Sequence, residues 1–218
     1  MAKSVTHIVG LIVAFSILCW QAQSPDLQKL LRGIELRYSR AQTLQLSFSE
    51  VFTAQGRPHT PESGELYLRK PGRMRWQYTK PSGKLLVSDG KDIYYYNADS
   101  NRVEHVRSKE AEDMRAPLGF LMGKLDFERD FREYKTEPAD AGKLWVTCVP
   151  KSEKLPYREV RFLATSKGQI EHVRVVSQDR SILDFDFRSE VLNPPLAESM
   201  FHFQMPQGAE YIDAAKNR

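Results

Sequence analysis

Histidine, cysteine and acidic side chains are the groups in this sequence that could bind a metal ion or transfer a proton. Beyond residue 22 the histidines and the cysteine are His59, His105, His172, His202 and Cys148. No two of them stand at the spacing of a metal-binding motif. The sequence also lacks a nucleophile elbow and a phosphate-binding glycine loop. We therefore predict no metal, no cofactor and no catalytic site, and an enzyme is the class of function that the sequence supports least.

One pair of carboxylates has a spacing that could serve acid–base catalysis. Asp184 and Asp186 lie two residues apart in a predicted strand, so both side chains point to the same face of a sheet. A solvated sheet face beside Phe185 and Phe187 produces the same pattern without any catalysis, and we favour this structural interpretation. Asp89 likewise has a sufficient structural role in an Asp-Gly turn.

Segment 64–97 has the most informative pattern in the chain, because short predicted strands alternate in it with Pro-Gly, Pro-Ser-Gly and Asp-Gly turns. Along residues 73–78, one strand face carries Met74, Trp76 and Tyr78, and the other carries Arg73, Arg75 and Gln77. This alternation predicts a sheet with one apolar face and one wet, basic face. Core packing accounts for any one of the three apolar residues, but the segment as a whole indicates a protein that holds an apolar object.

A helix near the start of the chain is the first element expected to pack against other parts of the protein. Ser24 can cap it, Pro25 suits its first turn and Asp26 complements its dipole. An apolar stripe at helical spacing follows, formed by Leu27, Leu30, Leu31, Ile34 and Tyr38. Such a stripe predicts an amphipathic helix with one buried side.

From residue 43 the hydrophobic period changes to two, which predicts β-strands. The apolar side chains on one face include Leu44, Leu46, Phe48, Phe52, Leu66 and Leu68, with Glu50 among them. Lys70 continues the same face, where a charged group is unfavourable unless it has a polar partner. One such partner would be a backbone carbonyl of a lid, which Lys70 would hold closed through a hydrogen bond. Extension of the side chain to solvent is the simpler alternative.

The remaining alternating segments extend the predicted sheet. They lie at 84–88, 92–97, 102–107, 134–138, 144–149, 157–164, 170–177, 182–187 and 201–205. The pattern as a whole predicts about ten or eleven antiparallel strands and one long helix. A sheet of this size tends to curl, and too few helices exist to cover a flat one. We therefore predict a mainly β protein, in which a strongly curved, open antiparallel sheet carries helices on its concave side.

Residues 110–131 interrupt the strands with acidic residues followed by an apolar cluster. The apolar residues are Leu118, Phe120, Leu121, Met122, Leu125, Phe127 and Phe131. The segment is too long for a hairpin loop and too apolar for a solvated one. Pro117 could start a short helix, so we predict a lid of one or two short helices over a hydrophobic surface. Its Met and Phe residues, placed beside glycines, could repack around apolar ligands of different shapes.

The first 22 residues have the features of a secretory signal peptide, with a positive charge at Lys3 and a short apolar run at 8–18. We predict cleavage after Ala22 and a single domain over residues 23–218. Cys148, the one cysteine that would remain, is expected in the core without a disulfide. The net charge of +4 is small and the acids and bases are interspersed, so nucleic acid is not an expected partner.

These patterns resemble the LolA family, the periplasmic carriers of outer-membrane lipoproteins. The residues that carry the likeness are Gly64, Leu66, Lys70-Pro71, Trp76, residues 87–91 (VSDGK) and Tyr96-Asn97. The apolar segment at 117–122 and the ending at 201–208 (FHFQMPQG) also fit, so the likeness covers nearly the whole chain after residue 22. The chain departs from the family at Lys70, where arginine is frequent, and at Met74, where some members have an aromatic residue. Lysine offers a point charge in place of a planar fork, so a latch built on it differs.

The resemblance implies an unclosed β-barrel that is lidded by helices and has a cavity for the acyl chains of lipoproteins. The residues expected to line the cavity are Leu27, Leu31, Leu46, Phe48, Leu66, Leu68, Met74, Trp76, Tyr78, Phe120, Leu121 and Met122. Lys70 is expected to latch the lid or to assist transfer. The resemblance also implies a periplasmic location and three partners: acylated lipoproteins as cargo, an inner-membrane ABC transporter that loads the carrier, and an outer-membrane receptor that unloads it. We expect a monomer.

Other functions fit the same residues. A binding protein for a glycolipid or a polyprenyl lipid, or a sensor of mislocalised lipoproteins, would use the same scaffold. An anchored receptor lipoprotein would need acylation at Cys19, but such signals have a small residue before the cysteine, where this chain has Leu18. The mass of the exported protein distinguishes this anchored lipoprotein from a free protein, because the free form would start near Gln23.

Overall fold

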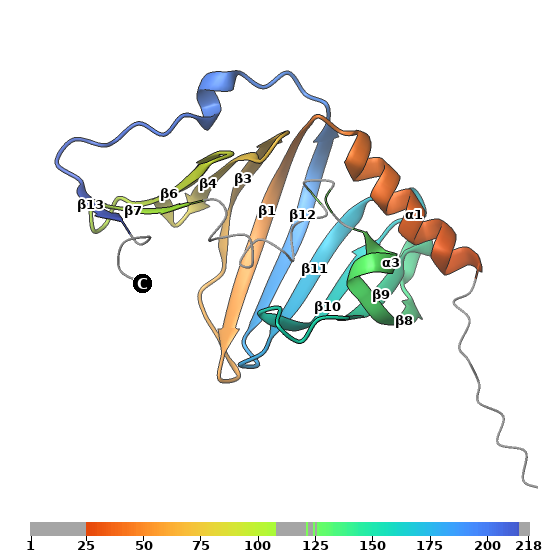
Figure 1. Ribbon diagram of the computed structural model, residues 1–218. Coiled ribbons are helices and arrows are strands. Elements are labelled where there is room, and N and C mark those ends of the chain that lie inside the picture. Colours follow the sequence, from red (N-terminus) through yellow and green to blue (C-terminus); the bar gives the residue numbers. More distant parts are fainter. Residues whose placement is uncertain (1–24, 108–120, 122–123, 125, 214–218) are drawn as a thin grey trace, which may run out of the picture.

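The computed structural model of the chain describes residues 25–107, 121, 124 and 126–213 (Figure 1). Its helices are α1 (Pro25–Arg40), α3 (Phe127–Asp130) and the 3-10 turns η2 (Asp140–Gly142) and η3 (Glu198–Phe201). Its strands are β1 (Thr43–Ala54), β2 (Arg57–Pro58), β3 (Glu62–Arg69), β4 (Arg73–Lys80), β5 (Ser82–Asp89), β6 (Asp92–Asn97), β7 (Arg102–Arg107), β8 (Phe131–Pro138), β9 (Leu144–Pro150), β10 (Tyr157–Ala164), β11 (Ile170–Ser177), β12 (Ile182–Leu192) and β13 (Glu210–Asp213). The predicted signal peptide, residues 1–22, lies outside the described residues, so the domain boundary after it stays a prediction.

Helix α1 forms where the apolar stripe predicts it. Leu27, Leu31 and Ile34 are buried on one side of the helix, and Ile34 has no exposed surface. Arg37 and Arg40 lie in the last turn, where positive charge complements the helix dipole. The helix is therefore amphipathic, and its buried side determines how it lies on the sheet.

All described strands belong to one 13-stranded sheet, in the order β13-β7-β6-β5-β4-β3-β1-β12-β11-β10-β9-β8, with β2 paired to β1. Strand β1 joins the two halves of the sheet, because it pairs with β3 on one side and with β12 on the other. The described strands form an open path, so the predicted unclosed sheet is confirmed. The strand number exceeds the predicted ten or eleven partly because β2 and β13 are short, and β13 pairs with β7 in parallel, not antiparallel.

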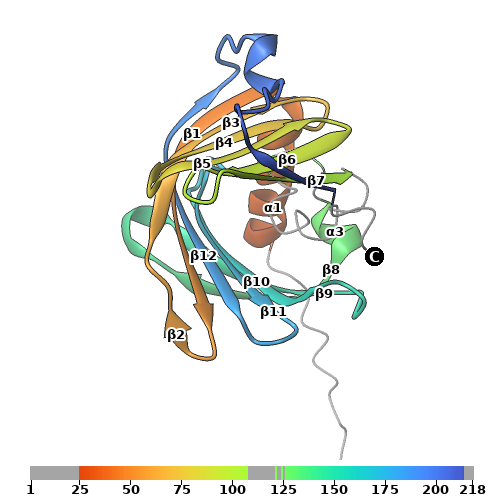
Figure 2. The ribbon, with the colours of Figure 1, turned by 90° about the vertical axis from the view of Figure 1, so that its left-hand side faces the viewer.

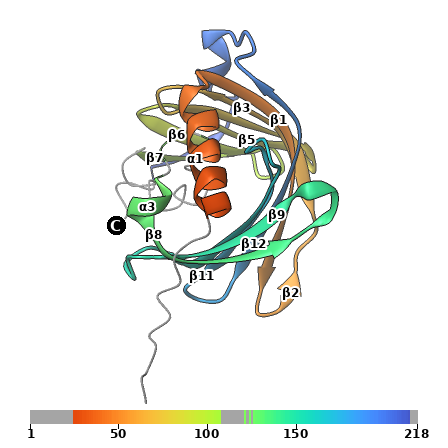
Figure 3. The same cartoon turned by 90° about the vertical axis from the view of Figure 1, so that its right-hand side faces the viewer.

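The sheet is strongly curved, and α1 and α3 lie inside the curve (Figures 2 and 3). The prediction of helices on the concave side is therefore confirmed for these two elements. Helix α3 has a single turn, capped by Asp126, whose side chain accepts a hydrogen bond from the Arg129 backbone N–H. Of the predicted lid at 110–131, residues 121, 124 and 126–131 are described, and the others lie outside the described residues.

The predicted strand at 201–205 is wrong. Phe201 ends the 3-10 turn η3, and residues 202–206 form neither helix nor strand, although Phe and polar residues alternate there. Pro206 has no backbone N–H to give to a ladder, and Phe201 is fully buried against the sheet. Residues 193–209 instead form a strap that crosses the side of the sheet away from α1 and leads to β13 (Figure 1).

The strap changes the interpretation of the predicted wet, basic face. Arg69 and Arg75 donate hydrogen bonds to the carbonyls of Leu196 and Met200 in the strap, at 2.9 and 3.2 Å. Farther along the sheet this face is apolar: Val87 and Val103 are fully buried together with Phe201. The prediction of a basic face therefore holds for β4, whereas the same face of β5–β7 buries apolar side chains beside a polar pair formed by Asp92 and His105.

Candidate functional site

The concave side of the sheet carries a continuous wall of buried apolar side chains. Alternation along β1, β3 and β4 directs the same-face residues toward α1. These residues, which we call the concave wall, are Leu46, Phe48, Leu66, Leu68, Met74 and Trp76, and all are buried in one hydrophobic cluster. The register explains this, because Leu46 pairs with Leu66, and Leu66 pairs with Trp76 on the next strand. Cross-strand pairing thus brings together the residues that the sequence predicts for the site.

Aromatic rings form the centre of the concave wall. The Phe48 and Trp76 ring centroids lie 4.8 Å apart with an interplanar angle of 69°, and Phe48 and Tyr78 lie 5.1 Å apart at 85°. Phe185 of β12 adds a third contact, with its centroid 5.7 Å from that of Trp76. Edge-to-face packing of this kind is favourable beyond the apolar area that it buries.

Glycine at position 64 permits this close packing. Gly64 pairs with Phe48 on β1 and with Tyr78 on β4. A Cβ atom at this position would lie 2.1 Å from the backbone oxygen of Gln77. The family-like Gly-x-Leu pattern at Gly64 therefore has a local physical reason, which is the approach of β3 to β4.

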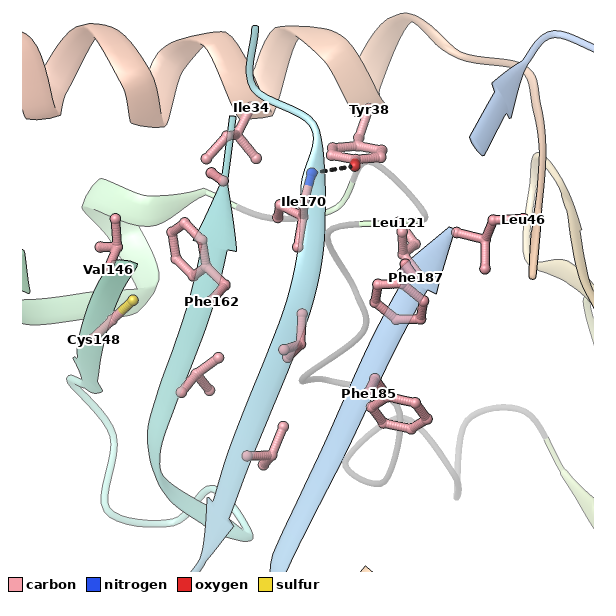
Figure 4. Packing of buried hydrophobic residues seen from close by; sticks show 14 of the residues in the cluster. Ile34, Tyr38, Leu46, Leu121, Val146, Cys148, Phe162, Ile170, Phe185 and Phe187 are labelled. Atoms are coloured by element: carbon pink, nitrogen blue, oxygen red, sulfur yellow. Dashed lines mark hydrogen bonds between the residues drawn. The ribbon is translucent and has the colours of Figure 1, made fainter. Parts of the chain in front are cut away.

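Helix α1 covers one end of the concave wall. Leu27 and Leu31, two more of the predicted site residues, are buried in the same cluster as Phe48 and Trp76. Figure 4 shows Ile34 and Tyr38 of α1 directed toward β10 and β11, with Phe185 and Phe187 on the neighbouring strand.

The predicted lid residues are placed only in part. Leu121 is buried and belongs to the concave cluster. Phe120 and Met122 lie outside the described residues, so their expected part in a cavity stays a prediction.

A polar network holds the last turn of α1 on the sheet. The Tyr38 hydroxyl donates a hydrogen bond to Glu190 at 2.7 Å and accepts one from the Ile170 backbone N–H at 3.0 Å. Arg37 donates to the other Glu190 oxygen, Oε1, from Nε and Nη2, at 3.0 and 2.5 Å. The Glu190 side chain is 1% exposed. Burial and the adjacent Glu190 carboxylate raise the pKa of Tyr38, which keeps its hydroxyl protonated as a donor.

Sequence reasoning missed Glu190. In an uninterrupted strand Glu190 would share the outer face with Asp186 and Arg188. A register shift between β1 and β12 and the positive φ of Ser189 mark a β-bulge there. The bulge turns Glu190 toward α1. Alternating hydrophobicity does not reveal such a shift, because the extra residue is a serine with no apolar signature.

Lys70, the cation predicted on the apolar face, is bound to the end of α1. The Lys70 ammonium donates hydrogen bonds to the backbone carbonyls of Tyr38 and Ser39, both at 2.7 Å. These carbonyls end the helix and have no partner within it. Burial lowers the pKa of Lys70. The hydrogen bond to a carbonyl that the sequence suggests is thus present with α1, and the expected latch to residues 110–131 stays a prediction.

Polar side chains follow Phe48 and Trp76 of the concave wall along β1 and β4. The Tyr78 hydroxyl donates a hydrogen bond to Glu50 at 2.9 Å, and Lys84 forms an ion pair with Glu62. Burial raises the pKa of Glu50, and the hydrogen bond from Tyr78 opposes this effect. Burial and the Glu50 carboxylate in turn raise the pKa of Tyr78. The neutral hydroxyl and the carboxylate therefore form a donor–acceptor pair.

The carboxylates that could have formed an acid–base pair lie on the opposite face. His172 contacts Asp186 with Nδ1 at 2.9 Å and Asp184 with Nε2 at 3.1 Å, and Arg174 binds Asp184 with two hydrogen bonds. A pocket of about 340 Å³ next to them is lined mostly by polar residues that include Glu171 and Asp186. The structural interpretation of the two aspartates as part of a polar sheet face is confirmed.

The described residues show no group of three or more His, Cys, Asp or Glu side chains placed to hold a metal ion. Cys148 is fully buried, and burial raises the pKa of its thiol, as expected of a core residue. None of the helices within the described ranges combines the length and the apolar character needed to cross a bilayer.

Comparison with known proteins gives consistent results. Residues 39–204 match the family described as "Outer membrane lipoprotein carrier protein LolA". A protein of Methylococcus capsulatus named "Outer-membrane lipoprotein carrier protein" is 31% identical over 207 residues, which cover 93% of this chain and 96% of that protein. A protein of the same name from Methylobacillus flagellatus is 26% identical over 208 residues, or 95% of this chain and 96% of that protein.

Among solved structures, an uncharacterized conserved protein from Thermus thermophilus has a similar fold. Its TM-score is 0.53 at 12% sequence identity, and the match covers 86% of this chain and 98% of that one. At this identity the likeness concerns the fold alone.

Proposed function

The chain belongs to the LolA family of outer membrane lipoprotein carrier proteins, and from this premise we propose that it is a periplasmic carrier that shelters the acyl chains of lipoproteins. The observation that carries the proposal is the concave wall of β1, β3 and β4, which forms one buried apolar cluster with side chains of α1 and β12 inside a curved, open sheet. Saturated hydrocarbon needs no specific polar partner, so a surface of this composition is suited to acyl chains.

The physical need for such a carrier follows from the hydrophobic effect. Three acyl chains of roughly 15 methylenes each, at ~0.8 kcal/mol per methylene, amount to about 36 kcal/mol of apolar surface exposed to water. An acylated lipoprotein therefore crosses an aqueous compartment only when a protein covers most of this surface.

Release of the cargo requires that the net affinity stay moderate. Trp76 is 8% exposed, and the other residues of the concave wall are at most as exposed. A bound acyl chain must therefore displace side chains that now pack on the wall, and the loss of their contacts offsets part of the binding energy. We propose that the segment at 110–131, to which the buried Leu121 belongs, is what moves.

The transfer route is also part of the proposal. An inner-membrane ABC transporter would load the carrier and an outer-membrane receptor would accept the cargo, with the carrier acting as a monomer that catalyses no reaction. The family membership supports this route.

A photo-crosslinking amino acid at Trp76, with the adducts of the exported protein identified by mass spectrometry, tests the proposal. The same amino acid at Gln77 is the control, because this residue is next in β4 and points to the opposite face. Acylated lipoproteins that crosslink from position 76 and not from position 77 are the expected result. Adducts with free lipid or glycolipid alone would favour a carrier of another apolar ligand, and no adduct from position 76 would overturn the proposal.

A further inference from the structure

The concave face changes from apolar and closed to polar and open along its strands. On β1, Leu46 and Phe48 are buried, whereas the next two residues on the same face are Glu50, which is partly exposed, and Phe52, which is 41% exposed. On β4, Trp76 is buried and the following same-face residue is the partly exposed Tyr78. The face therefore has an apolar interior and an amphipathic end.

Four side chains make up this amphipathic end, and we call them the mouth group: Glu50, Glu62, Tyr78 and Lys84. Glu50 and Glu62 are cross-strand partners in β1 and β3. Tyr78 donates to Glu50 Oε1 at 2.9 Å, and the Lys84 ammonium lies 5.9 Å from the centroid of the Tyr78 ring. Register and contacts thus place four residues from four strands beside one another.

The charges of the mouth group do not cancel. Lys84 forms an ion pair with Glu62, and the hydrogen bond that Glu50 accepts from the described residues comes from a neutral phenol. On the other side, the cross-strand partner of Glu50 is Phe185. The Lys84 ammonium, which is already paired with Glu62, offsets only part of the cost of burying the Glu50 carboxylate, so a further hydrogen-bond donor at this place on the concave face would stabilise it.

We propose that the mouth group binds the polar head of the acylated cargo, and that the Glu50 carboxylate accepts a hydrogen bond from the nitrogen of the cargo's acylated N-terminal residue. This inference rests on the proposed carrier function. Acyl chains that lie along Phe48 and Trp76 bring the head of the same molecule to the next residues along β1 and β4, which are Glu50 and Tyr78.

The chemistry of the mouth group favours a nitrogen donor over an acidic head. Glu50 accepts hydrogen bonds and adds negative charge, so a phosphate or carboxylate would be repelled. The nitrogen of an acylated N-terminal residue is an α-ammonium when only the side chain carries lipid, and an amide N–H when the nitrogen is itself acylated. Both are donors, and the ammonium forms the stronger, charge-assisted hydrogen bond.

Isothermal titration of the exported protein with two synthetic lipopeptides tests the inference. Both contain an S-diacylglyceryl cysteine at the N-terminus, one with a free α-amine and one with an acylated nitrogen. We compare the unchanged protein with Glu50→Gln. The control is Glu65→Gln, because Glu65 also accepts a hydrogen bond from a neutral hydroxyl, that of Ser47 at 2.8 Å, but lies on the opposite face of β3.

We expect Glu50→Gln to weaken binding of the free-amine lipopeptide about tenfold, as for loss of a charge-assisted hydrogen bond, while Glu65→Gln leaves it unchanged. A loss for the free amine alone shows that Glu50 requires the ammonium, and a similar loss for both lipopeptides shows that an amide N–H also serves as the donor. Unchanged binding of both by Glu50→Gln overturns the inference but not the carrier function. If the unchanged protein binds neither lipopeptide, both proposals fail.

A pH titration separates a binding role from a structural one. The groups that face Glu50 are Glu62, Tyr78, Lys84 and the nearby Tyr95. We expect the affinity of the unchanged protein for the free-amine lipopeptide to fall as the pH is lowered and Glu50 becomes protonated. In Glu50→Gln this dependence is reduced, and an identical pH profile in the two proteins would contradict the inference.

Discussion

The ammonium of Lys70 lies 2.7 Å from the backbone carbonyl oxygen of Tyr38, so a cation that follows β3 closes the C-terminal end of α1. Tyr38 is itself fixed on the sheet through Glu190 and the Ile170 backbone. The two contacts hold the end of α1 from both sides. The helix that covers one end of the concave wall is therefore anchored at its C-terminal turn.

Replacement of Lys70 tests this anchor. Lys70→Met keeps the aliphatic chain but removes the donor from two helix-end carbonyls, of which that of Tyr38 is part-buried and that of Ser39 is exposed. We expect a loss of about 1–3 kcal/mol in the free energy of unfolding, measured with urea. Lys70→Arg retains donors and is expected to lose less. Equal stability of the methionine variant and the unchanged protein would show that the anchor contributes nothing.

Removal of the Tyr38 hydroxyl affects the other side of the anchor. Tyr38→Phe leaves the Ile170 N–H without its partner and removes one donor from the buried Glu190 carboxylate. We expect a loss of about 2–3 kcal/mol in unfolding free energy. Tyr67→Phe is the matched control, because its hydroxyl has no hydrogen-bond partner among the described residues. A loss of the same size in both variants would argue against the network.

Stability should depend on pH through Glu50. Burial raises the pKa of Glu50 in the folded state, so the folded protein binds the proton more tightly than the unfolded chain. Its contribution to stability is therefore present below the unfolded pKa and is lost as the pH rises through the folded value. We expect Glu50→Gln to be more stable than the unchanged protein at pH 7, with a smaller difference near pH 4. Thermal unfolding at both pH values measures this, and a less stable glutamine variant at pH 7 would refute it.

Two glycines should respond to alanine in opposite directions. Gly64→Ala places a Cβ atom 2.1 Å from the Gln77 backbone oxygen, so β3 and β4 must separate at the concave wall. We expect a loss of about 1–3 kcal/mol. Gly33 in α1 has no atom within 4 Å of an added Cβ, and Gly33→Ala should gain about 0.5–1 kcal/mol. Denaturant unfolding of both variants provides the comparison, and a tolerated Gly64→Ala would mean that the strands can separate freely.

Local patterns in the sequence predict much of this fold. The stripe from Leu27 to Tyr38 predicts α1, and the Asp89-Gly90 turn predicts the β5–β6 hairpin. Alternation at Leu46, Phe48 and Trp76 predicts the buried face, because side chains of a strand point to opposite sides with a period of two.

Features that depend on distant contacts are not visible in the same way. Phe201 and its neighbours alternate like a strand but form a strap, in which Phe201 is buried against the sheet without a ladder. The inward position of Glu190 results from the bulge at Ser189. Alternation places Glu50 on the apolar face, but its partners Glu62 and Phe185 follow from the register of β1 with β3 and β12, which a single segment does not encode.

The pairing of β1 with β12 has a consequence for how the chain folds. Leu44 and Leu192 are partners in this pair, so a strand from the early part of the chain must pair with one that comes almost 150 residues later. The two hairpin series on either side have short loops and can form from local contacts, whereas the seam between them requires closure of a long loop. The buried cluster that joins Trp76 to Phe185 cannot be completed until β12 is available to pair with β1. Until then the apolar faces of both halves remain exposed to aggregation.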